Sequence, residues 1–104
     1  RRESNPGQAA DKSVFVVAQD VVDTESVIFH LNHSASGTCH YVIGSVKYDL
    51  DDGSSLLLSG FYFSFIEPGE IVDFTYERSR EDLSKGVVAS KAYVVIESAY
   101  FINP

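Results

Sequence analysis

The chain has 104 residues, of which 44% are hydrophobic, and this size and composition suit one domain with a single core. Eight Lys and Arg stand against fifteen Asp and Glu, so the formal net charge of −7 makes nucleic acid and anionic membrane surfaces poor partners. No apolar run approaches the roughly 18 residues that a membrane-spanning helix needs.

The first twelve residues are mostly polar or small, so we expect a flexible N-terminal tail or linker over 1–12 and a single domain over 13–104. The sequence contains no Met, which favours a processed or excised piece of an exported protein. The lone Cys39 fits either redox compartment, because it has no second cysteine in the chain to pair with.

The first two predicted strands follow this tail. Residues 14–22 are rich in β-branched side chains, which favour strands. Residues 26–32 alternate between apolar and polar positions, with Val27, Phe29 and Leu31 on one face. This period of two predicts a half-buried strand rather than a helix.

A hairpin is the clearest local signal in the middle of the chain. Turn-forming residues at 34–38 reverse the chain into a third predicted strand over 39–50. Asp52 and Gly53 then form a dipeptide typical of tight hairpin turns, because both residues tolerate a positive φ. A long fourth strand is predicted over 55–65.

Another turn, centred on Pro68 and Gly69, precedes a fifth predicted strand over 71–77. Residues 78–85 are highly charged and are predicted to form either one helical turn or a loop. Residues 87–102 favour strand throughout but exceed the usual strand length, so we expect a break, a reversal or a bend near Ser90.

Short strands separated by turns predict an all-β fold, an immunoglobulin-like two-sheet antiparallel β-sandwich of about seven strands. The count depends on whether residues 87–102 form one strand or two. The expected core draws on Phe15, Val27, Phe29, Leu31, Val42, Val46, Tyr48, Phe63, Phe74, Val94 and Ile96.

Four potential zinc ligands bracket one predicted hairpin, namely His30, His33, Cys39 and His40. His30 and His33 lie on opposite faces of an extended strand, so all four side chains cannot converge without distortion. We therefore predict no metal site and interpret these residues as solvated or packed histidines and a small buried thiol.

The acidic residues Asp49, Asp51 and Asp52 precede Gly53 with a spacing that does not match a calcium-binding loop, so a polar hairpin tip is predicted instead. No Gly-x-Ser-x-Gly elbow occurs. We predict that the protein is not an enzyme and has no cofactor.

Residues 56–65 are apolar on both faces of their predicted strand, with Tyr62 on one face and Phe61 and Phe63 on the other. Such a strand is either covered on both sides within the core or partly exposed for a partner. The second interpretation makes Tyr62, Phe61 and Phe63 candidate residues of a dimer or partner interface.

Three segments together resemble bacterial immunoglobulin-like envelope domains of the FxLYD type. They are the apolar strand 27–32, the strand 42–50 whose Tyr48 and Asp49 precede the Asp-Asp-Gly turn, and the stretch 65–70 that leads to Phe74. The resemblance covers about half of the chain. It implies an exported or envelope-attached interaction module and supplies no catalytic residues.

From these observations we expect a non-enzymatic binding or structural module, secreted or attached to the cell envelope. Its partner would be another protein or a second copy of itself. One alternative is a small secreted effector or inhibitor that acts on a protein target. A third alternative is a metal or hydrolytic site around His33, Cys39 and His40.

Overall fold

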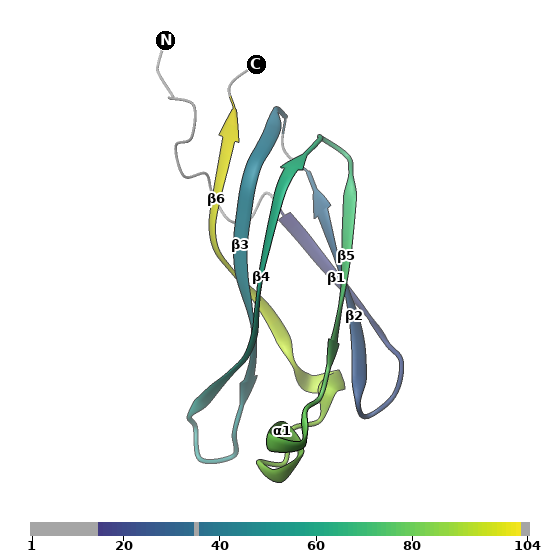
Figure 1. Cartoon of the computed structure of the whole chain (residues 1–104), viewed down its shortest axis with the longest axis vertical. Coiled ribbons are helices and arrows are strands. Elements are labelled where there is room, and N and C mark those ends of the chain that lie inside the picture. Colours follow the sequence, from purple (N-terminus) through teal and green to yellow (C-terminus); the bar gives the residue numbers. More distant parts are fainter. Residues whose placement is uncertain (1–14, 35, 103–104) are drawn as a thin grey trace.

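The computed structural model describes residues 15–34 and 36–102, most of which lie in β-strands. Two antiparallel sheets of three strands each pack face to face, which confirms the predicted all-β sandwich (Figure 1). The tail expected at residues 1–12 lies outside the described residues.

The first sheet has the order β1-β2-β5 and the second the order β4-β3-β6. Their strands are β1 (Phe15–Val21), β2 (Ser26–His33), β3 (Thr38–Asp49), β4 (Ser55–Ile66), β5 (Ile71–Glu77) and β6 (Tyr93–Ile102). In the standard lettering of immunoglobulin-like sandwiches, the first order is the same as that of strands A-B-E and the second the same as that of strands C′-C-F.

The described residues form six strands, because the long C-terminal segment holds one strand rather than two. A short 3₁₀ turn, η2 (Ala89–Lys91), provides the break expected near Ser90, and β6 follows it. The charged segment before it forms the one-turn helix α1 (Arg80–Ser84). Ser79 and Asp82 cap this helix reciprocally, which satisfies backbone N–H groups at its start.

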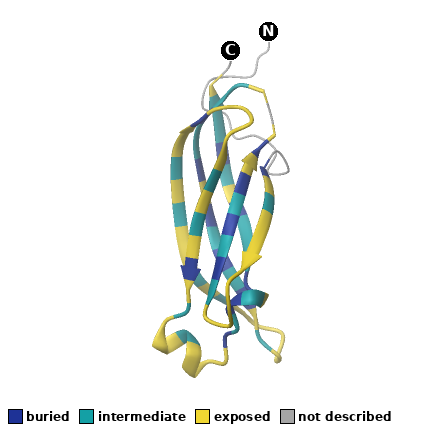
Figure 2. Cartoon of the chain, turned by 90° about the vertical axis from the view of Figure 1, so that its right-hand side faces the viewer, coloured by how far each residue is buried: buried dark blue, intermediate teal, exposed yellow. Residues whose placement is uncertain are grey.

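The core lies between the two sheets, where buried and exposed positions alternate along the strands (Figure 2). Val27, Phe29 and Leu31 of the central strand β2 are at most 1% exposed, as their alternation predicts. Phe63, Phe74 and Val94 are partly buried and pack against the core, whereas the other expected core residues are buried.

Gly44 in β3 allows an aromatic ring to pass through the middle of the sandwich. A Cβ at Gly44 would lie 2.1 Å from the Phe61 ring and 2.8 Å from the Val95 carbonyl oxygen. The Phe61 ring instead fills this space and lies 4.7 Å from the Phe74 ring of the opposite sheet. Glycine is therefore required here by packing rather than by backbone conformation.

The two turns predicted from Asp-Gly and Pro-Gly serve different purposes. Gly53, with φ of +90°, closes the β3–β4 hairpin, and the Asp52 carboxylate accepts bonds from the Ser54 backbone and hydroxyl. The Pro68-Gly69 turn instead joins β4 in one sheet to β5 in the other. The Gly69 N–H donates to the His33 carbonyl oxygen at 2.9 Å, which ties this crossover to β2.

Candidate functional site

A bulge in β3 turns two consecutive side chains toward the outside of the β4-β3-β6 sheet. The register of β3 against β6 shifts between Cys39 and Tyr41, which makes His40 the extra residue. Cys39 and Val42 are both fully buried. In a regular strand, one or three residues separate two positions on the same face, whereas two residues separate the buried Cys39 and Val42, so His40 and Tyr41 both face outward.

A second irregularity lies on the neighbouring strand β4. Phe65 has a φ of 55°, in the left-handed region that non-glycine residues rarely adopt. Its side chain is 63% exposed, whereas the next residue, Ile66, is 2% exposed and belongs to the core. The backbone is therefore strained, at a cost of about 1 kcal/mol, in a conformation that leaves a phenyl ring in solvent.

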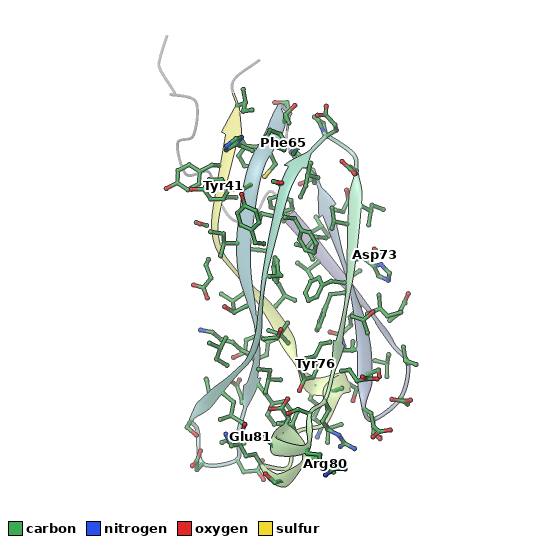
Figure 3. All side chains as sticks on the ribbon, in the orientation of Figure 1. Tyr41, Phe65, Asp73, Tyr76, Arg80 and Glu81 are labelled. Carbon is green, nitrogen blue, oxygen red and sulfur yellow. The ribbon has the colours of Figure 1, made fainter. Side chains whose placement is uncertain are left out.

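These features assemble an aromatic patch, defined here as His40, Tyr41, Tyr62, Phe65 and Tyr100. The ring of Tyr41 lies between two others, with centroids 5.8 Å from Tyr62 and 4.6 Å from Tyr100. The Phe65 ring meets His40 edge to face at 5.1 Å. Figure 3 shows Tyr41 and Phe65 at the same end of the β4-β3-β6 sheet.

The patch contains no Asp, Glu, Lys or Arg side chain. Burial raises the pKa of Tyr41, and its hydrogen bond to Tyr100 and the proximity of Tyr62 raise it further, so the hydroxyl stays protonated. Ile43, Ser64 and Ser98 flank the patch and are uncharged. The Glu97 carboxylate lies farther along the same face, where it accepts a hydrogen bond from the Ser45 hydroxyl at 3.0 Å. Nδ1 of His40 is enclosed without a hydrogen-bond partner among the described residues.

Of the three predicted interface residues, only Tyr62 belongs to this patch, where it is 61% exposed. Phe61 and Phe63 lie on the inner face of β4 and both contact the Phe74 ring, at 4.7 and 6.0 Å. Strict alternation from Phe63 would place Phe65 inside as well. The positive φ of Phe65 is the feature that sequence reasoning missed.

His30 lies on the other sheet, far from the patch. Its Nδ1 lies 2.6 Å from the Asp73 carboxylate of β5, and its Nε2 lies 2.8 Å from the Asp20 carboxylate of β1. The hydrogen bond to Asp73 and then that to Asp20 raise the pKa of His30. When protonated, the His30 ring donates to both carboxylates and so links all three strands of this sheet.

The other candidate ligands are separated as well. His33 is buried against the rings of Phe15 and Phe101, and its Nε2 lies 2.8 Å from the Gly37 carbonyl oxygen. Burial raises the pKa of the Cys39 thiol to about 11, so it is unreactive as a thiolate at neutral pH. Among the described residues, no group of three or more His, Cys, Asp or Glu is arranged to hold a metal ion.

A groove of about 430 Å³ lies between β4, β5 and α1 at the end of the sandwich. Four of its polar side chains already bond to one another: the Tyr76 hydroxyl donates to Asp82 at 2.6 Å, and Lys85 donates to Glu81 at 3.2 Å. Burial and the bond to Asp82 raise the pKa of Tyr76, so this hydroxyl also stays protonated. The groove is therefore a weaker candidate than the aromatic patch.

Comparison with known proteins finds no match of this chain to a family model, a curated protein or a solved structure. No helix within residues 15–34 and 36–102 is long and apolar enough to cross a membrane. The assignment of a site therefore rests on the geometry of the described residues.

Proposed function

We propose that this domain is a non-enzymatic binding module of an exported or envelope-attached protein, and that it acts through protein–protein contacts made by the aromatic patch. One observation carries the proposal. The strain at Phe65 and the bulge at His40 expose aromatic rings that a regular strand would bury or space apart. Strain of this kind is concentrated at functional sites.

The chemistry of the patch supports a protein partner. Tyrosine and phenylalanine are enriched in the buried centres of protein interfaces, and charged residues are depleted there. The patch has this composition although the whole chain carries a formal charge of −7. The exported or envelope location is supported by the resemblance of the strands and turns to FxLYD-type domains.

A non-enzymatic role is consistent with the state of two of the three histidines, His30 and His33. Both ring nitrogens of His30 are engaged by carboxylates, and His33 is buried with its Nε2 bonded to a carbonyl oxygen. Neither side chain is placed to take a proton from a serine or water nucleophile in the way a general base must.

Quantitative affinity capture from extracts of the source cells tests this proposal. Three baits are compared: the unaltered domain, the double variant Tyr62→Ser/Phe65→Ser, and Ile71→Ser. Ile71 is a matched control because it is 57% exposed on the opposite sheet, close to the exposure of Tyr62. We expect that some proteins are captured equally by the unaltered domain and by Ile71→Ser. The double variant should capture about tenfold less of these proteins, or lower amounts still. Equal retention by all three baits would refute the patch as the binding surface.

A further inference from the structure

We propose that the patch binds a second copy of this chain, so that two β4-β3-β6 sheets meet face to face in a symmetric dimer. This inference rests on the proposed function, because it names the partner of the same patch. Three properties of the patch support a copy of the chain over other partners: its charge, its hydrogen-bonding groups and its area.

Charge is the first argument. A partner recruited by opposite charge would need carboxylates or cations to contact, and the patch contains no Asp, Glu, Lys or Arg. The carboxylates of Glu97 and Glu67 lie outside it, where they accept hydrogen bonds from Ser45 and Thr38. The remainder of the chain is strongly acidic, with a formal net charge of −7. The aromatic patch is thus the part of this surface where two copies approach each other with the least repulsion.

The second argument is that the patch is complementary to itself. A tyrosine hydroxyl both donates and accepts hydrogen bonds, so a row of tyrosines can pair with the same row in a symmetric interface. The rings of Tyr62, Tyr41 and Tyr100 lie against one another at interplanar angles of 22° and 32°. Their ring faces are therefore partly covered within the row, and the Tyr41 and Tyr100 hydroxyls bond to each other. The ring edges and the remaining hydrogen-bonding capacity of the hydroxyls are left for the partner, rather than open ring faces on which sugars or bases could stack.

Area is the third argument. β3 and β4 have 12 residues each and β6 has 10, so the face is roughly 40 Å long and 14 Å wide at the usual strand dimensions. A flat face of these dimensions has an area of about 560 Å². The side chains that project from it make its accessible surface larger, closer to the roughly 800 Å² that each partner buries in a standard interface. The charged residues of this face, Lys47, Asp49 and Glu97, lie outside the aromatic patch and would form the polar rim of the interface. Patch and rim together are thus large enough for a specific dimer of modest affinity.

Sedimentation equilibrium of the full chain tests the dimer. We expect a monomer–dimer equilibrium with a dissociation constant that Tyr62→Ser and Phe65→Ser each raise by about 30-fold, because each change acts twice in a symmetric interface. Ile71→Ser should leave the constant unchanged. Added salt should strengthen the dimer, since it screens repulsion between two acidic chains, whereas it would weaken binding to a cationic partner.

A charge-swap pair provides a second, independent readout. Tyr62→Asp and Tyr62→Lys should each fail to dimerise alone, and their mixture should recover association, because only a shared interface brings the two substitutions together. Thermal melting of each variant confirms that it folds, as expected for a side chain that is 61% exposed.

The outcomes separate this inference from the proposed function. A monomer at concentrations up to about 1 mM, or a dimer that Tyr62→Ser and Phe65→Ser do not weaken, would overturn the dimer. If a different protein is then captured through the patch, the proposed function stands without self-association. If capture does not depend on the patch either, both fail. Patch-dependent binding of a polysaccharide to the monomer would also overturn the dimer.

Discussion

The two sheets of this sandwich expose faces of different character. On β1-β2-β5, His30 lies between Asp20 and Asp73, and polar pairs of this kind hold the strands together in water. On β4-β3-β6, uncharged aromatic rings occupy the surface at one end, and Figure 3 places Asp73 well away from Tyr41 and Phe65. The polar pairs on the first face are those expected of a sheet in contact with water. The second face has exposed aromatic rings and a strained backbone that folding alone does not require.

The largest expected effect comes from a substitution at Gly44, which packs against the Phe61 ring inside the sandwich. Gly44→Ala should lower the free energy of unfolding by about 1–3 kcal/mol, because the new methyl group overlaps the Phe61 ring and approaches the Val95 carbonyl oxygen. Urea denaturation measures this change. Gly60→Ala is the matched control, since its Cβ would meet only the Gly44 carbonyl oxygen, at 3.7 Å. Equal stability of the two variants would show that Phe61 does not depend on Gly44.

A smaller effect, of opposite sign, is expected at Phe65. Phe65→Gly should raise the free energy of unfolding by about 1 kcal/mol, because glycine adopts a φ of 55° without strain and little buried surface is lost. The neighbouring exposed residue gives the contrast: Ser64→Gly should lower stability by about 0.5–1 kcal/mol, since glycine is unfavourable within a regular strand. Loss of stability in Phe65→Gly would argue that its ring, not its backbone, matters for folding.

The smallest effect concerns the charged face and its dependence on pH. The pKa of His30 is raised above its ordinary value of 6.5 in the folded protein. Its stabilising contribution is therefore fully present below about pH 6.5 and is lost as the pH rises through the folded-state pKa. The difference in unfolding free energy between the unaltered protein and His30→Gln should be largest in acid and shrink toward alkaline pH. Both carboxylates are exposed, so water screens the pairs and the effect is modest.

An NMR titration of the His30 ring measures its raised pKa directly, without unfolding the protein. Asp73→Asn replaces the carboxylate whose hydrogen bond raises this pKa most by a neutral amide, so the titration midpoint should fall in that variant. A midpoint that Asp73→Asn leaves unchanged would contradict the assigned cause.

The sequence predicts the fold well where local rules act alone. Alternation at Val27, Phe29 and Leu31 identifies the buried face of β2, and the Asp52-Gly53 pair identifies the β3–β4 hairpin. The Pro68-Gly69 turn is also predictable as a turn. That it crosses between sheets is not, because local turn chemistry does not specify which sheet the next strand joins.

The candidate site is only partly predictable, because it depends on breaks in the alternation. Tyr62 and Tyr41 follow the period of two and can be assigned to the outer face. Phe65 does not, since a phenylalanine gives no sign of a left-handed backbone. The position of Tyr100 beside Tyr41 depends on the pairing of β3 with β6, which are separated by about half of the chain.

The most direct test of the account is an NMR dilution series on the unaltered domain, from about 1 mM to about 0.05 mM, a range that reveals dimers of modest affinity. We predict that amide signals change with concentration at Tyr41, Tyr62, Phe65 and Tyr100, and stay constant around His30 and Ile71. Concentration-dependent changes confined to the β1-β2-β5 sheet, or none on either sheet, would contradict the claim that the aromatic face joins two copies.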